Sequence, residues 1–284
     1  MIFRYLSVMC LICASAWALV GCGGGSGNTG NGGTGGVVVP PSPPTPTLVQ
    51  PGVYAATVNG QDFWGVITPA AWGTRWYGLH YAAANPDIFS GDLAGAGTAS
   101  ASVSTLRYFQ NTAATVLSGT ASMKSAGAGQ LSGDLNLVTT TPPYKQALSF
   151  VASAPVGMNY NQAAQLSDIA NKWTGNLSYG LGSFGNFEFN ITTSTGAQTT
   201  GSFPGAFSYD CQWSAANSML EPSTEMNIFR LKITMNVSTS CDFKGQTLTG
   251  VAFLQKSPVA GKTQRLIWVA TTAEGKGISF KADR

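Results

Sequence analysis

The stretch "NIFRLKITMNV", residues 227–237, alternates strictly between apolar and polar side chains. One face of an extended chain would carry Phe229, Leu231, Ile233, Met235 and Val237, and the other face would carry Arg230, Lys232, Thr234 and Asn236. Because successive side chains of a β-strand point to opposite faces, this pattern is typical of a strand with one buried face and one face in water. The segment therefore predicts an antiparallel β-strand.

The same period of two continues along residues 52–284. "NFEFNITT", residues 186–193, repeats the alternation, and Asn59-Gly60 lies between two strand-like runs as a hairpin signal. The pattern predicts eight strands in the first half, near 53–58, 62–68, 75–82, 87–93, 98–109, 115–123, 129–137 and 144–153. It predicts eight more in the second half, near 173–180, 185–193, 197–203, 206–214, 227–238, 243–255, 264–272 and 276–282.

One segment between the two sets has helical spacing. In "NQAAQLSDIANKW", residues 161–173, apolar side chains recur every three or four positions, Asn161 could cap the start, and Gly175 follows the end. We therefore expect an all-β protein with two small antiparallel β-barrel or sandwich domains, at 52–157 and 158–284, joined by a short helix.

The first fifty residues have a different composition. Residues 1–21 combine one cation, Arg4, with an apolar run, as in an export signal. After Cys22, residues 23–36 contain nine glycines and residues 40–51 contain six prolines. Neither composition supports a core, so residues 22–51 are predicted to be a disordered linker, flexible at first and then stiffer.

The remaining cysteines sort by position. Cys10 and Cys13 belong to the signal and Cys22 directly follows it, which leaves Cys211 and Cys241 in the folded region. In an oxidising compartment this even pair predicts one disulfide. A metal site is the alternative, but the chain has a single histidine, so we expect neither a metal nor a cofactor.

Charge and motifs argue against a nucleic-acid-binding protein and against an enzyme. Only 10% of the residues are charged and the net charge is +3, so the sequence has no basic footprint for nucleic acid. No Gly-x-Ser-x-Gly nucleophile elbow occurs. His80 lies within a strand pattern, which favours a packed side chain. We therefore do not expect an enzyme.

Aromatic residues are concentrated between Tyr54 and Tyr81. Most of them should fill a barrel core. Trp72, beside Gly73 between two predicted strands, should lie in a turn and is a candidate ligand contact, and so is its neighbour Trp76.

Leu19-Val20-Gly21-Cys22 resembles the lipobox of bacterial lipoproteins. That resemblance implies cleavage before Cys22, a diacylglycerol on its thiol and an acylated amino group such as a palmitate amide. It further implies an outer-membrane location, because no Asp follows the cysteine. The strand pattern is similar to that of outer-membrane lipoproteins with lipocalin-like or transferrin-binding-protein-like barrels. The second half also resembles small disulfide-bearing lipoprotein domains.

These features lead us to expect a lipid-anchored, non-enzymatic binding or interaction protein of the cell envelope, with an unknown protein or glycan as its ligand. Two alternatives stay open. One is an envelope assembly or protective factor, such as a periplasmic immunity protein or a secretion-system accessory lipoprotein. The other is an undetected hydrolase.

Overall fold

The computed structural model describes residues 48–284, apart from 82–85, 111–113, 139–144, 156, 180–181, 194–200, 203–204, 207–209 and 238–240. The predicted signal peptide, Cys22 and the linker as far as residue 47 therefore lie outside the described residues. Within the described part of the chain, no helix has the length and apolar character needed to span a membrane.

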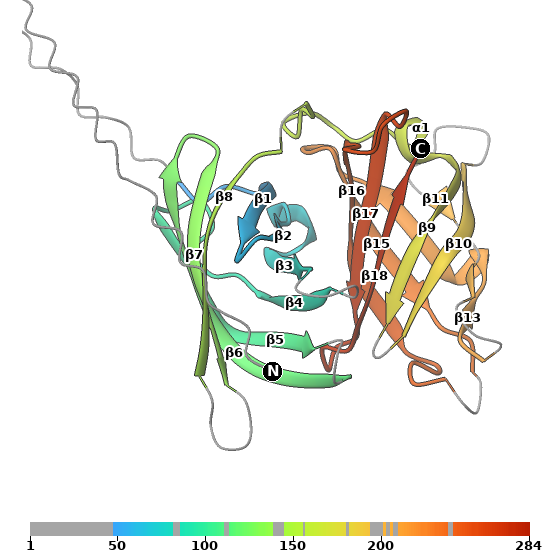
Figure 1. The fold of residues 1–284 in the computed structure, drawn as a ribbon, viewed down its shortest axis with the longest axis horizontal. Helices are drawn as coiled ribbons and strands as arrows, with labels where there is room; N and C mark the ends of the chain where they lie inside the picture. Colours follow the sequence, from blue (N-terminus) through green and yellow to red (C-terminus); the bar gives the residue numbers. More distant parts are fainter. Residues whose placement is uncertain are drawn as a thin grey trace, which may run out of the picture. The chain divides into compact units, whose positions relative to one another are not determined.

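The first half forms a closed eight-stranded barrel, called barrel 1 here (Figure 1). Neighbouring strands pair antiparallel in chain order, and β8 returns to pair with β1. Its strands are β1 (Gly52–Val58), β2 (Gln61–Ile67), β3 (Arg75–His80), β4 (Asp87–Asp92), β5 (Ser100–Gln110), β6 (Thr115–Gly127), β7 (Gln130–Val138) and β8 (Lys145–Ser153). All eight agree with the predicted strands, and Asn59 and Gly60 form the predicted β1–β2 turn with positive φ angles.

Aromatic rings over glycines fill the interior of barrel 1. Trp76 is fully buried there, and the rings of Phe63 and Phe150 stack with centroids 4.8 Å apart. Gly78 lies directly beneath Trp76, because a Cβ added at Gly78 would come within 2.8 Å of the indole ring. Small residues thus create the space that the large rings occupy, which is how a narrow barrel reaches a packed core.

The second half forms another closed barrel, barrel 2, in which strand β9 lies between β10 and β18. Its strands are β9 (Asn171–Tyr179), β10 (Gly182–Thr193), β11 (Gly201–Ser202), β14 (Ser218–Pro222), β15 (Ile228–Thr234), β16 (Thr247–Lys256), β17 (Gln264–Thr271) and β18 (Gly277–Asp283). The predicted fold class of two all-β units is therefore confirmed, and both units are barrels. Residues 227–237 contain β15, in which Phe229, Leu231 and Ile233 are buried as predicted. Met235 is buried just beyond the strand, but Val237, which was predicted on the buried face, is 89% exposed because the strand ends at Thr234.

The connection between β11 and β15 differs from the prediction. The described residues of the predicted strand at 206–214 do not form a barrel strand, since β12 (Gly205–Ala206) and β13 (Gln212–Trp213) pair with each other in a separate two-stranded sheet. The barrel position is taken by β14, which follows the short 3-10 helix η2 (Ala215–Asn217) and pairs with β15. Cys211, just before β13, is bonded to Cys241.

The predicted helix is also shorter than expected. The helix α1 covers only Leu166–Ile169, its N-terminal flanking residue is Gln165 rather than Asn161, and Gly175 lies inside β9. The chain leaves the helical path at Ala170, whose ψ is 159°, and Asn171, with a φ of 89°, then begins β9. Trp173 therefore belongs to a strand, although its indole Nε1 still donates to the carbonyl oxygen of Ile169 at 2.7 Å.

Both barrels lie within one compact unit, Thr45–Arg284, and share a buried apolar cluster. Outward-facing side chains of β1–β4 and of β15–β17 meet there, together with Tyr160 from the connecting segment. Trp64 Nε1 donates to Gln255 Oε1 at 3.1 Å across this cluster. The shared cluster explains why β16 and β17 are buried on both faces, whereas β5–β7 alternate between buried and exposed residues.

Candidate functional site

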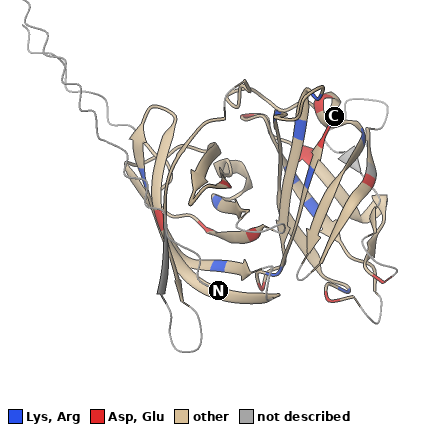
Figure 2. Ribbon diagram, in the orientation of Figure 1, with Lys and Arg blue, Asp and Glu red and all other residues tan. Residues whose placement is uncertain are grey.

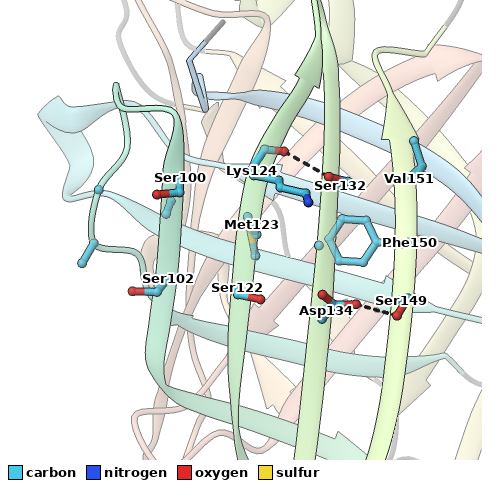
Figure 3. Close-up of a pocket in the computed structure, with 14 residues that line it drawn as sticks. Ser100, Ser102, Ser122, Met123, Lys124, Ser132, Asp134, Ser149, Phe150 and Val151 are labelled. Atoms are coloured by element: carbon cyan, nitrogen blue, oxygen red, sulfur yellow. Dashed lines mark hydrogen bonds between the residues drawn. The ribbon is translucent and has the colours of Figure 1, made fainter. Parts of the chain in front are cut away.

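A shallow cavity of about 860 Å³ lies on the outer face of β5–β8, on a part of barrel 1 that contributes little to the shared cluster. Figure 3 shows its lining residues, most of which come from the four neighbouring strands β5–β8, while Ala94 and Gly95 come from the connection before β5. We call this cavity the hydroxyl groove. Its floor and walls are formed by Ala94, Gly95, Ser100, Ala101, Ser102, Ser122, Met123, Lys124, Ser132, Gly133, Asp134, Ser149, Phe150 and Val151.

Strand register aligns short polar side chains across the groove. Ser102 pairs with Ser122, Ser122 with Asp134, and Asp134 with Ser149, so the four lie in one row across β5–β8. All four are exposed. The Ser149 hydroxyl donates to Asp134 Oδ1 at 2.5 Å, as drawn in Figure 3.

The next row is Ser100, Lys124, Ser132 and Val151, each paired with the next across the sheet. The groove is hollow because its outward residues are mostly serines, while the inward ones include Ala101 and Gly133. A Cβ at Gly133 would lie 2.6 Å from the Phe150 ring, so only glycine fits beneath that ring.

The groove carries little net charge. Its charged side chains are Lys124 and Asp134, one of each sign, and Figure 2 shows few charged positions on this part of the ribbon. Serine hydroxyls both donate and accept hydrogen bonds. The surface can therefore bind a polar ligand through many weak hydrogen bonds, but it offers no outward aromatic ring on which a sugar could stack.

A second polar group lies inside barrel 1. His80 and Asp87 are directly opposite in the β3–β4 register, so their side chains are on the same face, and the Tyr108 hydroxyl donates to Asp87 Oδ2 at 3.0 Å. Burial, together with the negative charge of Asp87, raises the pKa of Tyr108 above its ordinary value. The Tyr108 hydroxyl is therefore a neutral hydrogen-bond donor to the Asp87 carboxyl group at physiological pH.

His80 is buried beside Phe63, as the strand pattern predicted, and its Nε2 has no hydrogen-bond partner among the described residues. A polar group buried in this way is costly. Sequence reasoning identified His80 but not the neighbouring Tyr108–Asp87 hydrogen bond, because only the strand register places Asp87 opposite His80.

The structure separates the two candidate tryptophans. Trp72 ends the 3-10 helix η1 (Ala70–Trp72) between β2 and β3, as predicted, but it is partly buried against the cluster shared by the barrels. Trp76 is fully buried in barrel 1, and burial favours a packing role for it over the predicted ligand contact. The ligand contact of Trp72 stays a prediction.

The predicted disulfide between Cys211 and Cys241 is confirmed, with the two Cα atoms 4.9 Å apart. Cys22 lies outside the described residues. Within the described ranges, no group of three or more His, Cys, Asp or Glu side chains could hold a metal ion.

Sequence reasoning missed the hydroxyl groove. A signal existed in "SASVSTL" and "LSGTASMKS", where serine and threonine take nearly every outward position. No family model, curated protein or solved structure matches the chain.

Proposed function

We propose that this chain is a lipid-anchored, non-enzymatic interaction protein of the bacterial outer membrane that presents the hydroxyl groove to a polypeptide partner. The observation that carries the proposal is the division of barrel 1 into two faces. The outer face of β1–β4 is covered by barrel 2, while the groove on β5–β8 is solvent-exposed and hollow.

The packed interiors support binding on the outside. In barrel 1, Phe63, Trp76, Phe89 and Phe150 occupy the position where a lipocalin-type ligand would lie. In barrel 2, Trp173, Trp268 and Phe280 do the same. Because these side chains fill both barrel interiors, we expect a ligand to bind to outward-facing side chains.

The anchoring part of the proposal rests on the lipobox-like Leu19–Cys22 and on the Gly- and Pro-rich segment that follows. A tether of this composition lets the folded unit sample a thin layer next to the membrane. Confinement raises the effective concentration of the groove, so that weak contacts suffice for binding.

Site-specific photo-crosslinking tests the groove. A benzoylphenylalanine at Ser122, in the groove, should give polypeptide adducts in intact cells. The same residue at Lys232, an exposed position of β15 in barrel 2, is the matched control. Adducts whose crosslinked partner is sensitive to glycosidase but resistant to protease would show that the partner is a glycan rather than a polypeptide. Equal yields of adducts at both positions would refute a groove-specific function.

Labelled palmitate tests the anchor. The wild type should incorporate it, while Cys22→Ser should not and should leave the membrane fraction or retain its signal peptide. Equal incorporation by both proteins would contradict the lipid anchor.

A further inference from the structure

The chain enters the folded unit beside the hydroxyl groove. Val49, near the end of the predicted linker, is only 1% exposed and packs in the core of barrel 1. Its N–H donates to the carbonyl oxygen of Thr98 at 2.7 Å, and its carbonyl oxygen accepts from the N–H of Gly97 at 2.8 Å. These two backbone hydrogen bonds fix the place at which the linker joins barrel 1.

Gly97 and Thr98 belong to the loop at the rim of the groove. Gly95, on one side of them in the chain, and Ser100, on the other side, both line the groove. The Thr98 hydroxyl lies 2.7 Å from the carbonyl oxygen of Gly95 and 2.6 Å from that of Ser100, which holds the loop together. The chain that precedes Leu48 is therefore attached at the rim of the groove, next to β5.

The preceding segment is long enough to cross the groove. Neighbouring strands lie about 4.8 Å apart, so the distance from β5 to β8 is about 14 Å. Residues 40–47, Pro-Pro-Ser-Pro-Pro-Thr-Pro-Thr, contain five prolines. Because polyproline II rises about 3.1 Å per residue, these eight residues can reach about 25 Å. The three valines at 37–39 would then come to lie over β8.

The chemistry of the segment matches the order of side chains in the groove. Prolines lack an N–H and polyproline II makes no internal hydrogen bonds, so such a segment presents mainly carbonyl acceptors. The first strands it would cross carry donors, namely the exposed hydroxyls of Ser102 and Ser122 and the ammonium group of Lys124. At the far end of the groove, Val151 is apolar and 66% exposed (Figure 3). Acceptors therefore meet donors near β5, and valines meet a valine on β8.

The covalent connection lets a weak contact fill the groove. Residues 23–47 carry no charged side chain, and the groove has one charge of each sign, so charge does not oppose docking. A preformed polyproline II segment also loses little conformational entropy on binding. A short tether gives a local concentration in the millimolar range. Contacts of sub-millimolar affinity would therefore keep the groove occupied.

We propose that residues 37–47 of this chain dock in the hydroxyl groove, with residues 40–47 across β5–β7 and residues 37–39 against Val151. The linker then occupies the surface that a partner polypeptide needs, and the partner binds by displacing it. Displacement also lengthens the free part of the tether. This inference rests on the proposed function, because it describes the regulation of the same groove.

Photo-crosslinking within the purified mature chain tests the docking. A benzoylphenylalanine at Val151 should form an intramolecular adduct with residues 37–39, located by tandem mass spectrometry. The same residue at Val259, an exposed valine of barrel 2, is the matched control and should give no such adduct. An adduct yield that rises with protein concentration would overturn intramolecular docking, because it would show contact between separate copies.

A synthetic peptide of residues 37–47 tests competition for the groove. In a linker variant, residues 37–47 are replaced by a Gly/Ser sequence of equal length, and benzoylphenylalanine again stands at Val151. This variant should crosslink to the added peptide roughly five- to tenfold more than a chain with its own linker, in which the groove is already occupied. Equal yields of peptide adduct in the two chains would overturn self-occupation of the groove.

Serine variants test the predicted hydrogen bonds. In the linker variant, Ser102→Ala/Ser122→Ala should lower the yield of peptide adduct at least about threefold, because two donors are lost. Ser104→Ala is the matched control, since Ser104 is exposed on β5 but does not line the groove, and it should leave the yield unchanged. An equal decrease in both variants would contradict docking through the groove hydroxyls.

The cellular experiment separates this inference from the proposed function. Intramolecular adducts at Val151 without partner adducts at Ser122 in cells would retain the docked linker and remove the proposed partner. Partner adducts at Ser122 without intramolecular adducts at Val151 would do the reverse. If both hold, the linker variant should give more partner adducts at Ser122 than the wild-type linker does.

Discussion

The guanidinium Cζ of Arg284 lies 4.3 Å from the ring centroid of Trp173, at the point where β9 and the end of β18 meet α1. The same guanidinium donates to the carbonyl oxygens of Ala170, at 2.8 Å, and Asp168, at 2.6 Å. These carbonyls belong to the last turn of α1, where backbone acceptors have no partner within the helix. One side chain thus holds the short helix against the barrel and covers a buried tryptophan.

We expect Arg284→Ala to lower the free energy of unfolding by about 2 kcal/mol, because it removes charge-assisted hydrogen bonds and a cation–π contact. Urea unfolding followed by tryptophan fluorescence measures this loss. Arg230→Ala is the matched control, since Arg230 is exposed and its nitrogen lies 3.6 Å from Glu221, and it should change stability by about 0.5 kcal/mol at most. Equal losses of stability in the two variants would contradict the conclusion that Arg284 holds α1 against barrel 2.

The contrast between barrel strands and their connections shows what the sequence could predict. Strands such as β15 were predictable because one face meets the core and the other meets water, which produces the alternation. β14 was not, because five residues ending in Pro222 are too few for a period to emerge. The helix was predicted too long because Trp173, at helical spacing, packs against α1 from the following strand.

The groove and the shared cluster depend on relationships between strands. The row from Ser102 to Ser149 exists only once the register of four strands is fixed, and no single strand contains that information. Likewise, the apolar outward residues of β2 and β17 indicate burial on both faces but do not reveal that the two strands meet each other. Charge composition, cysteine pairing and fold class are local or compositional properties, so the sequence alone predicts them better.

The packing of Trp76 on Gly78 predicts that substitutions at these two positions have strongly non-additive effects on the free energy of unfolding. Gly78→Ala should destabilise the protein by about 1 to 3 kcal/mol, because the new methyl group would overlap the indole. In a Trp76→Leu background the same change should cost much less, since the ring is gone. A double-mutant cycle by urea unfolding measures the coupling, and additive effects would contradict the proposed packing.

The disulfide should stabilise the folded unit as a whole. Cys211 and Cys241 are 30 residues apart, a loop whose closure contributes about 3 to 4 kcal/mol in the chain-entropy treatment. Because the barrels share a buried cluster, we expect the double variant Cys211→Ala/Cys241→Ala to lower one cooperative melting transition of the mature chain. A melt that splits into an unchanged and a lowered transition would show that the barrels unfold independently.

The two tryptophans near η1 should differ in stability. Trp76→Ala should cost about 3 to 5 kcal/mol, as expected for a large buried ring. Trp72→Ala should cost less, about 1 to 2 kcal/mol, because its side chain is only partly buried against the shared cluster. Thermal and urea unfolding of both variants test the order, and equal costs would place Trp72 in the core and end its candidacy as a ligand contact.

Acid should weaken the ion pair near the end of barrel 2. Burial alone would raise the pKa of Asp283, but hydrogen bonds from Arg265 and Ser257 outweigh it and hold that pKa below its ordinary value. Arg265 Nε and Nη2 each donate to the carboxylate at 2.8 Å, and the Ser257 hydroxyl donates at 2.6 Å. The ionised carboxylate is therefore more stable in the folded chain than in the unfolded one.

A folded pKa below the unfolded one means that this stabilisation is complete above about pH 4 to 5 and declines as the pH falls through the folded pKa. Asp283→Asn should therefore be clearly less stable than the wild type at about pH 6, and the gap should narrow toward about pH 2. Urea unfolding across this range measures the gap. Asp92→Asn is the matched control, because Asp92 pairs with Arg75 on the surface with its side chain 83% exposed, and its gap should be small at every pH. A gap for Asp283→Asn that stays constant from about pH 6 to pH 2 would show that the residue acts through packing rather than through its charge.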